Sequence, residues 1–295
     1  MWRIMITNGK RWATRIAAAS AALLGLTIAA APASTAQARG ATPKPDHVVI
    51  IMMENRGYNS IIGSSKAPYL NSLAKQGALF TKSTAITHPS EPNYLALLSG
   101  STQGVRDDSC PHTFAADNLA HQLAASGASF VGYSEGLPKV GYTGCDTGDY
   151  ARKHNPWVNF SDVPTSANQP YTSFPKDYTK LPTVAWVTPN LQDDMHDGSI
   201  QKGDAWLKKN VDGYVQWAKA HNSLLVITWD EDEDNGGNNS IPTIFAGANV
   251  KSGQYSEKIN HYSVLRTLES AYGLAPLGAA ANATPITDVW SGGAS

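Results

Sequence analysis

The sequence has few of the features that define several classes of protein. It contains only 2 cysteines among 295 residues, which limits the chain to a single disulfide. After Ala31, no apolar run reaches the ~18 residues that a membrane-spanning helix needs, so stable membrane insertion is not expected. No stripe of lysine and arginine marks a nucleic-acid-binding face, so no nucleic-acid partner is expected. Beyond the N-terminal region there is no internal repeat and no low-complexity tract.

The N-terminus has the pattern of a secretory signal peptide. A basic region ending at Arg15 precedes the apolar stretch 16–31, and small residues at 36–38 form a cleavage site. A membrane anchor is the less favoured alternative, because the small-residue site follows so closely. We therefore expect residues 1–38 to be removed and residues 39–295 to form a single secreted domain. The signal holds four of the 23 basic residues, which leaves 19 against 24 acids and a net charge of −5.

Both cysteines, Cys110 and Cys145, lie in the exported part of the chain. An oxidising compartment favours a disulfide between them. Because the loop that it closes is long, this disulfide would stabilise the fold by ~3–4 kcal/mol.

Strand and helix patterns alternate along the chain. This order predicts an α/β fold with a mostly parallel sheet and helices on both faces. Residues 136–174 are rich in Gly, Pro, Asn and Tyr, and we expect a long excursion over the site. The expected strands are 47–53, 78–81, 129–134, 183–187, 224–228 and 243–246, and the expected helices are 67–76, 92–98, 118–125, 205–220 and 261–272.

Acidic and amide side chains follow two of the expected strands. Glu54 and Asn55 come directly after strand 47–53, and Asp230 and Glu231 come after strand 224–228. In an open α/β sheet, ligands bind at the carboxyl ends of the strands. Hard oxygen ligands at one edge indicate a divalent metal ion. The alternatives are an ordinary turn after the first strand and a solvated acidic loop after the second.

A calcium loop of the EF-hand type does not explain the acidic run. Asp230, Asp232 and Asp234 fall at positions 1, 3 and 5 of such a loop. However, the sixth position is Asn235 where glycine is required, and the twelfth is Ile241 where glutamate is required.

A candidate nucleophile, Ser90, stands just before the expected helix 92–98. One interpretation is a helix N-cap, whose hydroxyl accepts a backbone N–H. The other is functional, because a helix N-terminus favours phosphate and a neighbouring metal would turn the hydroxyl into a nucleophile.

Further polar groups lie in three other segments. His196 and Asp197 combine an imidazole and a carboxylate, which suits a metal ligand or a general acid. Lys153 and His154 form a basic pair that could contact phosphate oxygens, or they could belong to a simple turn. His261 begins a helix, where it could equally be a surface residue.

In combination, these motifs resemble the secreted bacterial phosphoesterase family, which includes acid phosphatases and phospholipases C. The chain is most similar to the acid phosphatase and phosphatidylinositol-3-phosphatase branch. The matching segments span nearly the whole mature chain in the family order. They are Met53–Arg56, His88–Gly100, Tyr150–Pro156, Asp194–Gly198, Thr228–Glu231 and His261–Thr267.

The resemblance implies an alkaline-phosphatase-like fold, a three-layer α/β/α sandwich. It implies that Ser90 is the nucleophile and that Asn93 lies near the phosphate oxygens. It gives the metal-ligand role to Glu54, Asn55, Asp230 and Glu231. His196 and Asp197 occupy the place of a catalytic histidine or second metal site, and His154 and His261 are weaker correspondences. The acidic run is longer than the family usually shows, so Asp232 could compete with Glu231.

We therefore expect a secreted, metal-dependent phosphomonoesterase that acts through a phosphoserine. Lys153 and His154 would bind the substrate, a small phosphorylated compound or a phosphoinositide, and His196 would protonate the leaving alcohol. The oxygen ligands suit Ca, Mg or Mn, whereas His196 would favour Zn or Fe. Two alternatives are a phosphodiesterase of the phospholipase C type and a non-enzymatic binder of metal or glycan. The short chain weighs against the first, and Ser90 against the second.

Overall fold

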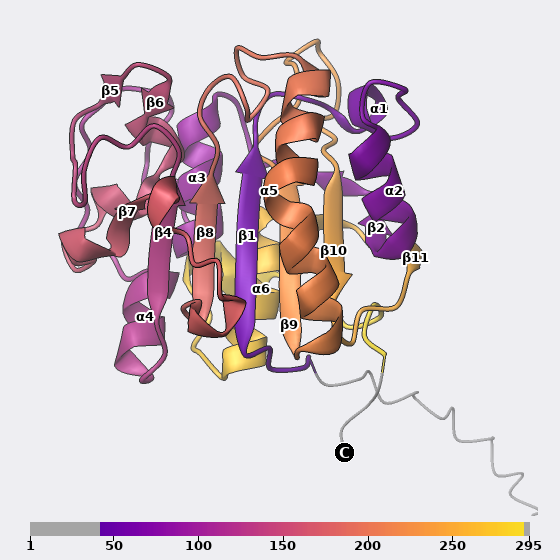
Figure 1. Cartoon of the computed structure of the whole chain (residues 1–295). Coiled ribbons are helices and arrows are strands. Elements are labelled where there is room, and N and C mark those ends of the chain that lie inside the picture. The colour runs from indigo at the N-terminus through magenta and orange to yellow at the C-terminus, as the bar shows by residue number, and fades with distance from the viewer. Residues whose placement is uncertain (1–41, 292–295) are drawn as a thin grey trace, which may run out of the picture. The chain divides into compact units, whose positions relative to one another are not determined.

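An eight-stranded sheet forms the centre of the described part of the chain, residues 42–291 of this computed structural model (Figure 1). The strand order is β11-β2-β10-β9-β1-β8-β4-β7. The neighbouring strands are parallel except where β10 pairs with β9 and with β2. The strands are β1 (His47–Met53), β2 (Ala78–Phe80), β4 (Phe130–Ser134), β7 (Asn168–Pro170), β8 (Val184–Thr188), β9 (Ser223–Trp229), β10 (Thr243–Gly247) and β11 (Gly253–Tyr255).

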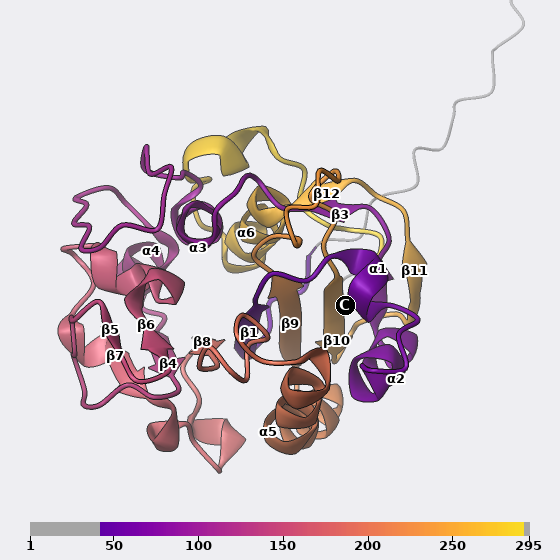
Figure 2. The same cartoon turned by 90° about the horizontal axis from the view of Figure 1, so that it is seen from above.

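Helices cover both faces of this sheet. Alternate residues of β1 point to opposite faces, so Ile50 belongs to one buried apolar cluster and Ile51 to the other. The Ile50 face packs against α3 (Ser90–Ser99), α4 (Leu119–Ala125) and α6 (His261–Tyr272), and the Ile51 face against α1 (Tyr58–Ile61), α2 (Pro68–Gln76) and α5 (Ile200–Ala220). Figure 2 shows these three layers from above. The expected α/β/α sandwich is therefore confirmed.

Shorter elements complete the described region. Two ladders lie outside the main sheet: β3 (Ser83–Thr84) with β12 (Ile259–Asn260), and β5 (Asp146–Thr147) with β6 (Tyr150–Ala151). The 3-10 helices are η1 (Arg152–His154), η2 (Pro156–Asn159), η3 (Thr165–Ala167), η4 (Tyr171–Ser173), η5 (Tyr178–Lys180) and η6 (Gly278–Asn282).

The register of the two central strands, β1 and β9, determines which residues meet at the carboxyl edge of the sheet. β1 and β9 are parallel neighbours, and Met53 is opposite Trp229. The backbone N–H of Asp230 continues the ladder, because it donates to the Met53 carbonyl at 3.0 Å. Glu54 and Asp230 therefore leave the sheet at the same level, as expected from the carboxyl ends of parallel strands.

The start of α3 differs from the expectation. The helix begins at Ser90, and the cap position belongs to Pro89, which offers no side-chain hydrogen bond. The interpretation of Ser90 as an N-cap is therefore wrong. Proline is tolerated anywhere in the first turn, so Pro92 did not mark the first helical residue. Helix α5 likewise begins earlier than expected, at Ile200, where Ser199 caps it.

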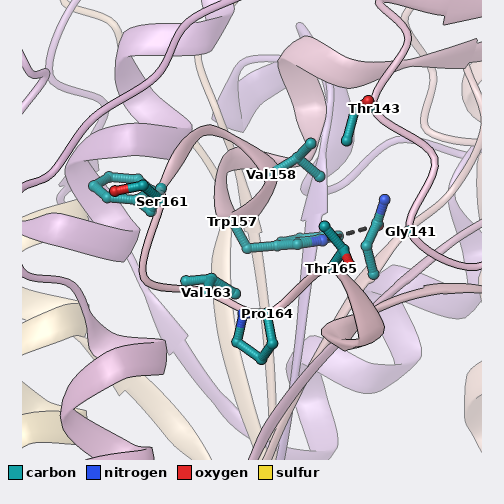
Figure 3. Close-up of a pocket in the computed structure, with 10 residues that line it drawn as sticks. Gly141, Thr143, Trp157, Val158, Ser161, Val163, Pro164 and Thr165 are labelled. Atoms are coloured by element: carbon teal, nitrogen blue, oxygen red, sulfur yellow. Dashed lines mark hydrogen bonds between the residues drawn. The ribbon is translucent and has the colours of Figure 1, made fainter.

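The excursion 136–174 is less irregular than its composition suggested. Its strand β7 extends the main sheet beside β4, and its 3-10 turns pack on that edge (Figure 1). Trp157 is buried against Gly132 and donates to Asn168 Oδ1 at 2.9 Å. A cavity of ≈ 170 Å³ lies beside Trp157 (Figure 3), and none of the candidate site residues lines it. Only the part of the excursion around Lys153 and His154 contributes to the candidate site.

The expected disulfide is present. Cys110 and Cys145 are bonded, with their Cα atoms 5.8 Å apart. Within residues 42–291, no helix has both the length and the apolar character to cross a membrane. The expected signal peptide, residues 1–38, and its cleavage site lie outside the described residues.

Candidate active site

Ser90 lies between two carboxylates at the carboxyl edge of the sheet. Its hydroxyl is within hydrogen-bond distance of Glu54 Oε2 at 3.1 Å and of Glu231 Oε1 at 3.0 Å. A hydroxyl has one proton, so it can donate to only one of these oxygens at a time. The other contact brings two oxygens together and requires a proton or a cation between them. Ser90 is almost completely buried, so water cannot screen this repulsion.

A third carboxylate increases the negative charge around Ser90. Asp230 is fully buried; its Oδ1 accepts from the Asn55 backbone N–H at 3.1 Å, and its Oδ2 has no hydrogen-bond partner. Burial, and then the charges of Glu54 and Glu231, raise the pKa of Asp230. Burial also raises the pKa of Glu231, and the charge of Glu54 adds to this effect. A buried acidic oxygen without a partner fits a bound cation.

The side-chain amide of Asn55 completes this set of oxygens. It lies 2.9 Å from Glu54 Oε2 and 3.3 Å from Glu231 Oε1. Either its nitrogen donates to both carboxylates, or its oxygen joins them around a cation. Asn55 also has a φ of 46°, in the left-handed region that asparagine tolerates better than most residues. The donor set of Glu54, Asn55, Asp230 and Glu231 therefore fits a hard divalent ion.

Glu54 faces a second group of side chains through its other oxygen. Tyr94 donates its phenolic proton to Glu54 Oε1, and His154 Nε2 lies 2.9 Å from the same oxygen. Burial alone would lower the pKa of His154, but the negative charges of Glu54 and Asp194 raise it to about 9. Burial alone would raise the pKa of Glu54, but the charge of His154 and the Tyr94 hydroxyl lower it to about 2. Glu54 and His154 therefore form a buried ion pair.

His196 joins the same group. One ligand atom each from Glu54, His154 and His196 lie within 4.8 Å of one another, which suits a metal ion with mixed oxygen and nitrogen ligands. A metal ion at this place would have to replace the proton of the His154 side chain at Nε2, because only a neutral imidazole binds a metal. Groups of side chains that could hold a metal ion therefore lie at both carboxylate oxygens of Glu54.

His196 also contacts Asp197 and Lys153. Its Nδ1 lies 2.7 Å from Asp197 Oδ1, and its Nε2 lies 3.4 Å from Lys153 Nζ. The carboxylate keeps a proton on Nδ1 and so orients the ring. With Nδ1 beside Asp197, Nε2 is the ring nitrogen that lies beside Lys153.

Two expected site residues contact the backbone. Asn93 is fully buried; its Oδ1 accepts from the backbone N–H groups of Ile86 and Thr87, and its Nδ2 donates to the carbonyls of Thr87 and Pro89. These bonds hold the turn before Ser90. His261 donates from Nε2 to the Asp230 carbonyl at 2.8 Å.

The pKa of His261 fits a supporting role. Burial lowers it to about 4, and the bond to Asp230 opposes this shift only in part. The ring is therefore neutral, and it supports Asp230 through the backbone of that residue.

Four contacts were not expected from the sequence. Tyr94 lies one helical turn after Ser90, and this spacing could have indicated that both side chains face the same carboxylate. His88 Nδ1 lies 2.5 Å from Glu231 Oε2. Asp194 Oδ2 lies 3.3 Å from His154 Nδ1, and the Asp194 carbonyl accepts from the Glu54 N–H at 2.9 Å. No spacing rule predicts the contacts of His88 and Asp194, because they join segments that are distant in the sequence.

Comparison with known proteins identifies the family of the chain. The model of the phosphoesterase family matches residues 63–275. The chain belongs to the phosphoesterase family. A phosphatidylinositol-3-phosphatase of Mycobacterium tuberculosis is 52% identical over 92% of this chain and 91% of its own length. A probable acid phosphatase of Kluyveromyces lactis is 33% identical over 81% of this chain and 63% of its own length. An acid phosphatase of Aspergillus fumigatus is 31% identical over 77% of this chain and 55% of its own length.

Solved structures agree on the fold. A Vibrio parahaemolyticus protein of the alkaline phosphatase superfamily is 12% identical, with a TM-score of 0.58 over 84% of this chain and 72% of that chain. The C-terminal periplasmic domain of EcEptC from Escherichia coli is 11% identical, with a TM-score of 0.52 over 79% of this chain and 84% of that chain. The resemblance, the alkaline-phosphatase-like fold and the class of enzyme, a phosphoric ester hydrolase, are confirmed.

Proposed function

We propose that this phosphoesterase is a secreted, metal-dependent phosphomonoesterase that acts through a phosphoserine at Ser90. The observation that carries the proposal is the place of the Ser90 hydroxyl between Glu54 and Glu231. A buried hydroxyl beside several carboxylates has little value for stability, because the acids repel one another. The same arrangement is useful when a cation binds the acids and the hydroxyl together.

Glu54, Asn55, Asp230 and Glu231 would hold the divalent ion. When bound, the ion would lower the pKa of the serine hydroxyl and offset negative charge on the phosphoryl group. The remaining chemistry belongs to the side chains. Ser90 Oγ gives its proton to a neighbouring carboxylate and attacks phosphorus in line. The bond from phosphorus to the alcohol oxygen breaks, and the phosphoryl group stays on Ser90.

His196 moves the second proton. Its Nε2 gives a proton to the leaving alcohol while Asp197 holds Nδ1. In the second half of the reaction, Nε2 takes a proton from the water that attacks phosphorus, the bond from phosphorus to Ser90 Oγ breaks, and Oγ takes its proton back from the carboxylate as inorganic phosphate leaves. Lys153 and the protonated His154 place positive charge near the oxygens of the phosphoryl group. Asn93 and His261 position the Ser90 turn and the Asp230 backbone.

The substrate proposal rests on relatives and charge. The Mycobacterium relative is named as a phosphatidylinositol-3-phosphatase, and the fungal relatives as acid phosphatases. We infer a small phosphorylated substrate or a phosphoinositide for this chain. Secretion is supported by the signal pattern at residues 1–38 and by the Cys110–Cys145 disulfide.

A direct assay tests the proposal. Phosphate release from p-nitrophenyl phosphate is measured for the wild type, Ser90→Ala and Ser99→Ala, with and without EDTA. Ser99 lies in the same helix, and its hydroxyl donates to the Leu95 carbonyl, so it is a matched control. We expect activity in the wild type and in Ser99→Ala, and loss of at least about 10³-fold in Ser90→Ala.

The metal and the ester class are tested in the same assay. EDTA should abolish the activity, and a divalent ion should restore it. Persistent activity after prolonged chelation, with no metal found by elemental analysis, would contradict the metal dependence. Release of alcohol from bis(p-nitrophenyl) phosphate but none from the monoester would favour the phosphodiesterase alternative.

A further inference from the structure

Asp108 makes two contacts beside the proposed nucleophile. Its Oδ1 accepts from the backbone N–H of Glu91 at 3.0 Å, and its Oδ2 accepts from Lys153 Nζ at 2.9 Å. Glu91 directly follows Ser90 in the first turn of α3, and Lys153 lies 3.4 Å from His196 Nε2. One carboxylate therefore bridges a donor next to Ser90 in the chain and a donor close to His196.

The position of Asp108 is fixed by covalent and polar links. Asp108 stands two residues before Cys110, which is bonded to Cys145. The Arg152 N–H donates to the Cys145 carbonyl at 2.8 Å, and the Arg152 side chain donates to the His112 carbonyl at 2.9 Å. These links join the loop that carries Asp108 to the segment that carries Lys153. The contact is therefore a built feature of the fold.

The Glu91 N–H and Lys153 Nζ are donors of the kind that bind the oxygens of a phosphoryl group on Ser90. A backbone N–H in the first turn of a helix and a lysine ammonium are common partners of phosphate oxygens. Like a phosphoryl group, a carboxylate presents two oxygens from one atom. Burial alone would lower the pKa of Lys153, but its bond to Asp108 and the charges of Asp108 and Glu54 raise it, so the amine is positively charged.

We propose that Asp108 is an internal competitor of the phosphoryl group and sets the affinity of the site for phosphate. A bound monoester takes the Glu91 N–H and Lys153 Nζ from the Asp108 carboxylate. After hydrolysis, the carboxylate returns to these donors and helps to displace the product, inorganic phosphate. This inference rests on the proposed function, because it assigns the Ser90 side of the site to the phosphoryl group.

The competition gives Asp108 a role different from that of the metal-binding acids. Glu54, Asp230 and Glu231 would help to bind substrate, and their removal should weaken both binding and turnover. Removal of the Asp108 charge should strengthen the binding of phosphate, because Lys153 and the Glu91 amide lose their internal partner. The competition from Asp108 would raise KM for the monoester, and it would also weaken inhibition by the product, inorganic phosphate.

The test compares Asp108→Asn with Asp107→Asn. Asp107 is in the same loop and its carboxylate accepts from the backbone N–H and the hydroxyl of Ser109, so this control removes an equal charge without breaking the bonds to Glu91 and Lys153. For Asp108→Asn we expect KM for p-nitrophenyl phosphate and the inhibition constant of inorganic phosphate to fall by about three- to fivefold, the range of a partly exposed ion pair. We expect kcat to change little and Asp107→Asn to match the wild type.

An increase in KM, or unchanged constants, would overturn the proposal, and an increase would indicate that Asp108 holds Lys153 in place. Thermal melting checks that each variant is folded, and Asp108→Ala provides a second variant without an amide. Calorimetric titration with inorganic phosphate measures binding without turnover. If the wild type hydrolyses no monoester, the proposed function fails, whereas tighter phosphate binding by Asp108→Asn would still support the competition.

Discussion

Met53 and Trp229 are opposite each other in the neighbouring parallel strands β1 and β9. Because their register is fixed, the residues that follow them, Glu54 and Asp230, leave the sheet together and meet beside Ser90 at the start of α3. The fold thus concentrates negative charge in a buried position. It does so at the edge where open α/β sheets bind their ligands. Such a concentration of buried charge lowers the stability of the fold unless a cation binds there.

The carboxylates around Ser90 should destabilise the metal-free protein. Burial and the charge of Glu54 raise the pKa of Glu231, so its ionised form is unfavourable in the fold. Glu231→Gln should therefore raise Tm in EDTA, and it should reduce the gain in Tm that a divalent ion gives the wild type. Thermal melting with and without the ion measures both effects.

Glu233→Gln is the matched control for this experiment. Glu233 lies in the same acidic run, and its Oε2 accepts from the Gly57 N–H at 2.9 Å, a bond that glutamine can keep. Its response to the ion should equal that of the wild type. A Glu231→Gln protein that is less stable in EDTA and gains the full stabilisation from the ion would show that Glu231 is structural.

The buried carboxyl of Glu269, which is not among the candidate site residues, should make stability depend on pH. Glu269 is fully buried, its Oε1 accepts from the Leu277 N–H at 2.8 Å, and burial raises its pKa to about 7. An acid with a raised pKa binds its proton more tightly in the folded state. Its contribution is therefore most favourable below its ordinary pKa of 4.5 and is lost as the pH rises through about 7.

Glu269→Gln should remove this pH dependence. Glutamine keeps an acceptor for the Leu277 N–H but carries no charge, so the variant should gain stability over the wild type between pH 5 and pH 8. Urea unfolding at a series of pH values gives the difference in the free energy of unfolding. A constant difference across the series would mean that Glu269 does not titrate in this range.

Much of the fold could be predicted because its elements follow simple periodic patterns. The bounds of β1 and α6 agree with the expected ranges 47–53 and 261–272, since a buried apolar strand and an amphipathic helix are strong signals. The acids at the ends of β1 and β9 could be located because parallel strands deliver their carboxyl ends to one edge.

Other contacts of the site could not be predicted, because they join segments that lack a periodic pattern. The pairing of Asp108 with Lys153 depends on the path of two loops and a disulfide between them. The contact of Asp194 with His154 is of the same kind. For Ser90, the sequence indicated the correct segment but not the helix boundary, since proline can occupy several positions in a first turn.

The central claim, that Ser90 carries the phosphoryl group during turnover, is tested most directly by trapping the intermediate. The wild type is mixed with a phosphomonoester and quenched in acid during steady turnover, and its peptides are analysed by mass spectrometry. The account predicts phosphate on the Ser90 peptide of the wild type and none on that of Ser90→Ala. Phosphate on another residue, or turnover by Ser90→Ala at the wild-type rate, would contradict it.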